Sequence, residues 1–203
     1  MAPSKPSRRD GFTLIEILVV LALMSIIALF SFPALQRMIS RSKIQGITTQ
    51  TSILMQQARF EAIKRGLATF VVADAGRGEI AVVTDDNGDG QWNTATDTVL
   101  ARAPLPNGVK FWAAGEAPNG ANAVTFAPAL ACTPSCPSGG GVAYRTDGSV
   151  NGMGAFRFGD MKDNFTEVAI AIAATGRLEV RKYDAGDSKY HVQGDNGVAW
   201  SWN

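Results

Sequence analysis

The stretch from Phe12 to Pro33 is an almost unbroken apolar run of about 20 residues, long enough to span a bilayer as a helix. Glu16 is the only ionisable residue in this run. A charge at the centre of a membrane helix costs on the order of 2.5–3.5 kcal/mol even on lenient insertion scales. Glu16 is therefore predicted to have a function, together with a cationic partner.

The charge of the chain is distributed unevenly around this run. The segment before Phe12 carries a net charge of +2, which leaves −1 for the rest of a chain whose total is +1. The positively charged flank of a membrane helix stays in the cytoplasm, so most of the chain is predicted to face outward. The weakly negative body has no overall attraction to nucleic acid or to an anionic membrane.

A small residue, Gly11, precedes the apolar run, whereas a secretory signal places a small residue after a shorter run. The sequence "GFTLIE" resembles the prepilin cleavage and methylation motif of type IV pilins and type II secretion pseudopilins. The resemblance implies cleavage between Gly11 and Phe12 by a prepilin peptidase and methylation of the new amino group on Phe12. Residues 1–11 are then a leader peptide, and residues 12–33 form the transmembrane and assembly helix.

Such a cleavage creates the cation that Glu16 requires. Glu16 lies four residues after Phe12, about 6 Å along a helix. When helices pack with a stagger, the Glu16 carboxylate of one subunit can neutralise the terminal amine of a neighbour, and a wrong register leaves both charges unpaired. Glu16 is thus predicted to select the register of assembly. The alternative interpretation is a glutamate that snorkels to the membrane interface.

Residues 34–66 follow a helical pattern with an amphipathic stripe. Apolar and small residues recur at steps of three and four from Ile44 to Ala58, and Gly66 is typical of a helix C-cap. Pro33 lacks a backbone donor and is predicted to kink or loosen the helix. The two parts predict one helix of roughly 50 residues, about 80 Å long, whose second half is a spine for the remaining domain.

Residues 67–203 consist of short β-type runs separated by Gly, Pro, Asn and Asp. These runs predict one or two antiparallel sheets, with hairpin turns at "RTDGSV" and "ATGRL". The predicted fold class is α+β: a long N-terminal α-helix with a transmembrane first half, packed on an antiparallel β-rich globular head. The sequences "AIKRG", "TDDNGDGQW" and "GRLEVR" resemble minor pseudopilins of the GspH/FimT type.

One loop has the spacing of a cation site. Asp85, Asn87 and Asp89 alternate and Gly90 follows, as in the first half of an EF-hand loop, which binds Ca²⁺. Thr96 occupies the twelfth position, where a bidentate glutamate is expected. A Ca²⁺ site and a metal-free acidic hairpin loop are both consistent with this pattern, and the metal-free loop is favoured. No other cofactor is predicted.

The segment "GRLEVRK" raises the question of DNA binding, with Arg177, Arg181 and Lys182 as candidate contacts. Pilins resembling FimT can capture DNA through a glycine–arginine–Xaa–arginine segment near the carboxy terminus. Here Arg181 falls two residues late, and Glu179 lies between the arginines, where it repels phosphate. Binding would be weak and sensitive to salt. The favoured alternative is that the arginines pair with Glu179 or with another subunit.

Cys132 and Cys136 are the two cysteines of the chain. Outside the cytoplasm they would close a small disulfide loop; free thiols are the alternative, and one Cys–Xaa3–Cys pair is poor evidence for zinc. His191 is the only histidine and has no companion serine or cysteine signature, so no enzymatic activity is predicted.

The sequence predicts a structural subunit, a minor pilin or pseudopilin of a type IV pilus or a type II secretion pseudopilus. It would be held in the bacterial inner membrane by one helix, with the head in the periplasm or outside. The partners implied by the resemblance are the prepilin peptidase, other pilins or pseudopilins in a helical filament, and an inner-membrane assembly platform. The alternative is a competence-type minor pilin that binds DNA for uptake.

Overall fold

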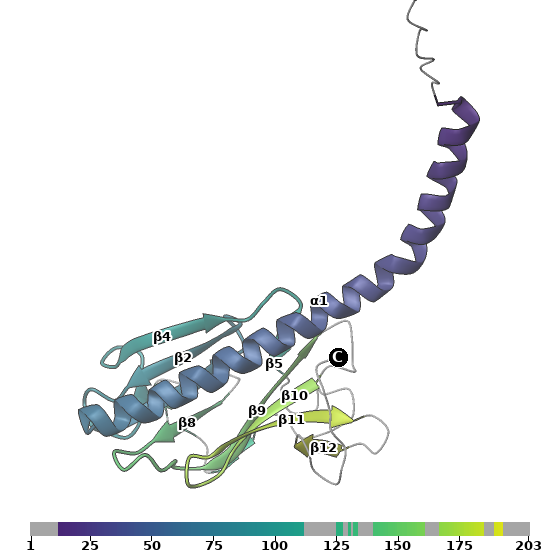
Figure 1. Ribbon diagram of the computed structural model, residues 1–203. Helices are drawn as coiled ribbons and strands as arrows, with labels where there is room; N and C mark the ends of the chain where they lie inside the picture. Colours follow the sequence, from purple (N-terminus) through teal and green to yellow (C-terminus); the bar gives the residue numbers. More distant parts are fainter. Residues whose placement is uncertain are drawn as a thin grey trace, which may run out of the picture. The chain divides into compact units, whose positions relative to one another are not determined.

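The computed structural model describes residues 12–111, 125–127, 130, 132–133, 140–160, 167–184 and 189–192. Its elements confirm the predicted fold class, because one long helix is followed by a head of mainly antiparallel strands (Figure 1). The elements are α1 (Leu14–Arg65), β1 (Thr69–Asp74), β2 (Glu79–Thr84), β3 (Trp92–Asn93), β4 (Thr98–Pro104), β5 (Val109–Phe111), β6 (Thr125–Ala127), β7 (Cys132–Thr133), β8 (Gly141–Tyr144), β9 (Met153–Asp160), β10 (Glu167–Ile172), β11 (Leu178–Asp184) and β12 (Lys189–Val192).

Helix α1 has 52 residues and continues through Pro33 without a break. The chain forms two compact units that divide between Ile39 and Ser40, within this helix. From Ser40 onward the buried residues recur at steps of three and four: Ser40, Ile44, Ile47, Thr48, Thr51, Leu54, Met55, Ala58 and Ala62. The predicted cap is present, since Gly66 has φ 66° and its N–H donates to the Ala62 carbonyl at 3.1 Å.

The head contains two main sheets. Sheet 1 has the antiparallel order β4-β2-β1-β8, and sheet 2 has the antiparallel order β12-β11-β10-β9-β5, with β6 also paired to β9. A short ladder between β3 and β7 is parallel, unlike the predicted antiparallel pattern. The turn at 174–178 joins β10 to β11 as a hairpin, as predicted. The predicted turn at 145–150 also reverses the chain, with an antiparallel bridge between Tyr144 and Val150, and it leads from sheet 1 into sheet 2.

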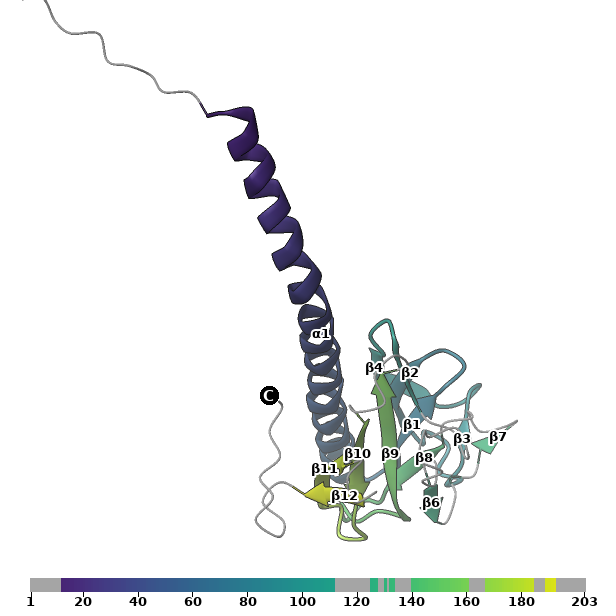
Figure 2. The same cartoon turned by 90° about the vertical axis from the view of Figure 1, so that its right-hand side faces the viewer.

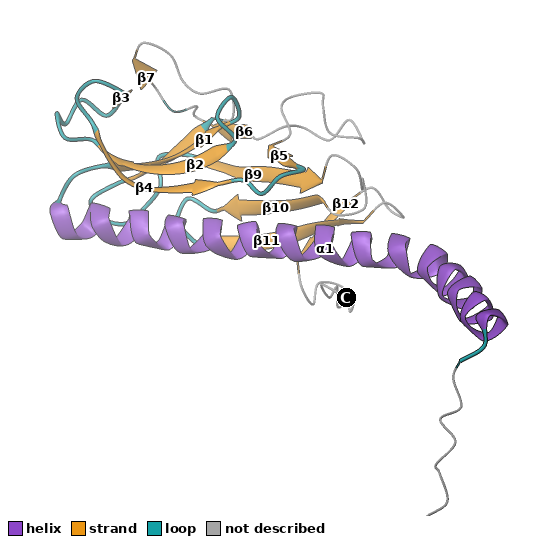
Figure 3. Cartoon of the chain, turned by 90° about the horizontal axis from the view of Figure 1, so that it is seen from above, coloured by secondary structure: helices purple, strands orange, loops and turns teal. Residues whose placement is uncertain are grey.

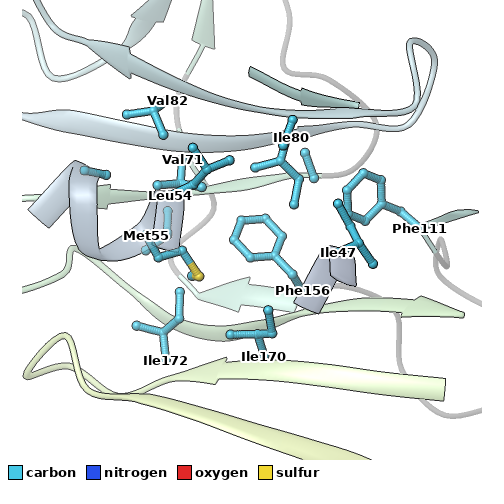
Figure 4. Close-up of a cluster of buried hydrophobic side chains, with 14 of the residues drawn as sticks. Ile47, Leu54, Met55, Val71, Ile80, Val82, Phe111, Phe156, Ile170 and Ile172 are labelled. Atoms are coloured by element: carbon cyan, nitrogen blue, oxygen red, sulfur yellow. The ribbon is translucent and has the colours of Figure 1, made fainter. Parts of the chain in front are cut away.

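The main core lies between the second half of α1 and the two sheets, which run alongside this part of the helix (Figures 2 and 3). Figure 4 shows Met55 of the helix among side chains from both sheets, with Val71 and Ile80 from sheet 1 and Phe156 and Ile170 from sheet 2. Truncating a buried phenylalanine such as Phe156, which is 0 % exposed, typically costs about 3–5 kcal/mol. The helix and both sheets therefore stabilise one another.

Sheet 1 is buried on both faces. Val71 and Ile80 face the main core, while Phe70 and Val72 belong to a second cluster on the opposite face. Because alternate residues of a strand point to opposite faces, both sets must be apolar. This explains the nearly continuous apolar sequence of β1, in which polar residues do not alternate with apolar ones.

Polar contacts fix the start of the buried part of α1. The Ser40 hydroxyl donates a hydrogen bond to the Asp160 carboxylate at the end of β9, and both residues are only 8 % exposed. One turn later, Lys43 Nζ donates to the Asn107 carbonyl at 2.9 Å, just before β5. A buried carboxylate without donors would be costly, so these contacts define where the packed part of the helix begins.

Two glycine turns pack against the end of α1. Gly148 and Gly176 have φ values of 80° and 78°, and a Cβ atom on Gly176 would lie 2.8 Å from the Gly148 carbonyl oxygen. A Cβ atom on Gly148 would lie 2.9 Å from Ile63 Cδ1 and 3.1 Å from Arg59 Nε. Both turns therefore require glycine for the backbone conformation, and Gly176 requires it also for the space, because the atom that blocks its Cβ belongs to the backbone.

Gly148→Ala is expected to destabilise the head by about 1–2 kcal/mol, because it places a residue with a Cβ atom at a left-handed φ of 80°. Thermal unfolding of the full chain in detergent, followed by circular dichroism, should show a Tm lowered by several degrees. Gly46→Ala is the control, because this helical glycine has nothing within 4 Å of its Cβ position and alanine favours helix. Equal Tm values for the two variants would contradict the prediction.

Candidate functional site

The first half of α1 is not covered by the described chain. Its large apolar side chains, from Phe12 to Ile39, are 43–82 % exposed. The helix is long and apolar enough to cross a membrane by length and composition, and none of the apolar window is buried. Such a surface is unstable in water, so it needs lipid or protein around it.

The polar groups within this half are suited to apolar surroundings. The Ser25 hydroxyl donates to the Leu21 carbonyl at 2.8 Å, which satisfies the hydroxyl within the helix. Pro33 lies inside the helix, where its missing donor leaves one backbone carbonyl without the usual partner. Among the described residues of this half, Glu16 is the only acidic group that apolar surroundings would have to accommodate.

Glu16 lies in the first turn of α1, where Thr13 caps the helix. The Glu16 N–H donates to the Thr13 carbonyl at 3.1 Å and to the Thr13 hydroxyl at 3.3 Å. The spacing Thr-Xaa-Xaa-Glu is that of a capping box, and a carboxylate at this end also favours the positive pole of the helix dipole. The Glu16 carboxylate is thus also suited to its place at the start of the helix, a signal that "TLIE" carries in the sequence. Phe12, 82 % exposed, precedes the cap, and Gly11 lies outside the described residues.

In the acidic loop after β2, carboxylates accept hydrogen bonds from backbone N–H groups of the same loop. Asp85 is 2 % exposed, and its carboxylate accepts hydrogen bonds from the N–H groups of Gly88 and Gly90, both at 2.8 Å. Asn87 Nδ2 donates to Asp89 Oδ2 at 2.9 Å. These hydrogen bonds stabilise the loop conformation without a bound cation. In the described part of the chain no three His, Cys, Asp or Glu residues converge as a metal site would require, and Ca²⁺ binding by Asp85, Asn87 and Asp89 stays a prediction.

The three candidate DNA contacts lie on or next to β11. Arg181 Nη2 donates to Glu179 Oε2 at 2.7 Å, and Arg177 Nη2 lies 3.7 Å from Glu179 Oε1. The predicted pairing of the arginines with Glu179 is therefore confirmed. Lys182 lies opposite His191 of β12. The hydrogen bond from Arg181, more than any other contact, lowers the pKa of Glu179.

Cys132 lies in β7 and pairs with Trp92 of β3 in the parallel ladder. The Cys132 side chain is disulfide-bonded. Its Sγ is 3.7 Å from the Leu130 carbonyl oxygen. Cys136 lies outside the described residues, so the pairing of the two cysteines stays a prediction.

Two protein-family models match the chain, one near its N-terminus and one over the second half of α1 and much of the head. Residues 6–32 match the family model of the prokaryotic N-terminal methylation motif, and residues 49–176 match that of type II transport protein GspH. No curated protein gives a significant match.

Two solved structures of the minor pseudopilin EpsH from the type 2 secretion system of Vibrio cholerae are similar to the chain. The first is 11 % identical, with a TM-score of 0.45, and the match covers 68 % of this chain and 94 % of that chain. The second is 16 % identical, with a TM-score of 0.41, and the match covers 70 % and 92 % of the two chains.

Because the hydrogen bond from Arg181 lowers the pKa of Glu179, removing Arg181 should raise the pH at which Glu179 titrates. In NMR titration of the carboxyl carbon, Arg181→Ala should raise the Glu179 midpoint toward the ordinary value of about 4.3. Arg177→Ala, which removes the more distant partner, should raise it less. Because the pKa is lower in the folded state, this pair stabilises the fold above the ordinary pKa, and the stabilisation is lost as the pH falls through the folded pKa. Equal shifts in the two variants would contradict the assignment.

Proposed function

Because the chain belongs to the family of type II transport protein GspH, whose model matches residues 49–176, we propose that it is a minor pseudopilin of a type II secretion system. The observation that carries the proposal is the uncovered apolar half of α1, which overlaps a methylation motif at residues 6–32. A helix of this kind needs two successive environments, the bilayer before assembly and a filament core afterwards.

The proposed maturation begins with cleavage between Gly11 and Phe12 by a prepilin peptidase and methylation of the Phe12 amine. The protein then crosses the inner membrane once, with its head in the periplasm. Other pseudopilins, recruited at an inner-membrane assembly platform, replace the lipid around the helix. Apolar burial does not drive this exchange, because lipid is as apolar as another helix; close packing and paired polar groups do.

Glu16 is the polar group that gives this exchange a defined register. In a filament core its carboxylate pairs with the terminal amine of an adjacent subunit. Removing one partner of a buried ion pair typically costs about 3–5 kcal/mol, since the other charge stays buried without compensation. That cost is large enough to decide between helix registers.

DNA capture by a competence-type pilin is not proposed for this chain. The family match points to type II transport, and Glu179 lies between Arg177 and Arg181 and pairs with both. A carboxylate in that place reduces the attraction of the strand for phosphate groups.

Glutamine in place of Glu16 separates the assembly role from the capping role. Glu16→Gln retains a side chain that a capping box accepts but removes the charge. The variant should be cleaved and inserted normally, while its incorporation into filaments falls at least about tenfold, because the neighbouring amine is left unpaired. Incorporation is measured by in-cell cross-linking to other pseudopilins, followed by quantitative immunoblotting of membranes and filaments.

Thr13→Ala is the matched control, because it removes the cap and keeps the charge. It should assemble far better than Glu16→Gln. If Glu16→Gln assembles like the unchanged protein while Thr13→Ala fails, Glu16 serves only to cap the helix.

A further inference from the structure

The second half of α1 exposes apolar side chains on the side that faces away from the main core. Among the described residues from 40 onward, four large apolar side chains are exposed, and three of them lie on this helix: Ile53, Phe60 and Ile63 are 58 %, 63 % and 53 % exposed. Thr51 is fully buried and precedes Ile53 by two residues, a rotation of about 200° around a helix. Ala58 and Phe60 are related in the same way. These exposed side chains therefore lie opposite the sheets, which run along the other side of this part of α1 (Figure 3).

The exposed apolar side chains belong to a stripe with a seven-residue period. Residues spaced alternately three and four apart are all exposed along this side of the helix, and we name them the outer stripe: Gly46, Thr49, Ile53, Gln56, Phe60 and Ile63. A stripe of two positions in every seven is the pattern with which one helix packs along another. A bilayer surface would bind a broader apolar face, whereas the exposed Gln50 and Gln57 flank this stripe. The pattern favours an α-helix as the occupant.

The charges beside the outer stripe argue against a second copy of this chain as that occupant. The exposed residues of α1 from 40 to 65 include no carboxylate and four cations: Arg41, Arg59, Lys64 and Arg65. The one acidic side chain in this part of the helix, Glu61, already pairs with Lys64 and Arg65. Residues that flank the seam of two parallel helices face each other across it, so Arg59 of one copy would lie near Lys64 of the other. Like charges in that place would destabilise the pair.

We propose that the outer stripe is the docking site for an α-helix of a different pseudopilin in the same filament, with apolar residues along its seam and no cations opposite Arg59 and Lys64. The inference rests on the proposed function, which supplies parallel helices held in one membrane. The stripe extends about 26 Å from Gly46 to Ile63, enough for more than two heptads of packing. Outside the bilayer this stripe is in contact with water, so covering its apolar side chains favours docking.

Photo-cross-linking in cells that produce the whole secretion assembly tests the occupant. A p-benzoylphenylalanine residue in place of Ile53 should cross-link to the helix of a different pseudopilin, identified by mass spectrometry of the linked peptide. The same residue in place of Met153, an exposed apolar side chain of β9, is the control and should not link to that helix. A product that joins two copies of this chain, that contains only lipid, or that forms within one chain would overturn the proposal.

Substitution of Phe60 tests whether the outer stripe contributes to docking. Phe60→Ala should lower the yield of the cross-link from position 53 about tenfold, because it truncates an aromatic anchor of the interface. Phe60→Leu should retain most of the yield, since it keeps an apolar side chain, and Met153→Ala should leave the yield unchanged. Phe60 is exposed, so Phe60→Ala should not change the Tm of the purified chain in detergent. An unchanged cross-link yield or a lowered Tm in Phe60→Ala would contradict the proposal.

Failure of this inference is distinguishable from failure of the proposed function. If Phe60→Ala is incorporated and cross-linked like the unchanged protein while Glu16→Gln is not incorporated, the outer stripe is not a docking site and the proposed function stands. Absence of a cross-link from position 53 in a chain that is incorporated normally has the same meaning. A chain that is never incorporated into filaments contradicts the proposed function, and the inference fails with it.

Discussion

A single helix that is covered along only half of its length is the constraint on which the rest of this structure depends. From Ser40 onward, α1 contributes one side of the main core, and its buried residues follow a helical stripe. Before Ile39, apolar side chains of the same helix are uncovered by the described chain. Burying a leucine, isoleucine or phenylalanine side chain contributes about 1.5–3 kcal/mol. The uncovered half therefore requires a bilayer or neighbouring helices, and the membrane and filament roles proposed for the protein follow from this requirement.

The head limits how much of the helix the chain itself can cover. Packing begins where the Ser40 hydroxyl meets the Asp160 carboxylate, and it ends where Arg59 and Ile63 contact the glycine turns. Between these points both sheets contribute apolar side chains, so the spine cannot leave the head without exposing the core. In the proposed filament the two halves have separate tasks: the first half makes the shared helical core, and the second half anchors the head.

The features that depend on local sequence could be predicted, and those that depend on long-range pairing could not. The helix from Leu14 to Arg65, its cap at Gly66 and the arginine pairs of Glu179 all involve residues close in the chain. The partner of Ser40 lies 120 residues away, so no local pattern could identify it. The contact of the Arg157 guanidinium with the Tyr190 ring likewise exists only once β9 to β12 adopt their register. The apolar sequence of β1 showed a strand, but burial on both faces appeared only with the arrangement of sheet 1.

In the proposed assembly, removal of the leader gives the apolar helix a terminal cation that can pair with Glu16 of a neighbour. Intact-mass and N-terminal peptide mass spectrometry of the protein, purified from membranes of the native cell, tests whether this cation forms. We expect a chain that starts at Phe12 and carries one methyl group on its terminal amine. A protein that retains residues 1–11, or one that begins at another residue, would contradict it.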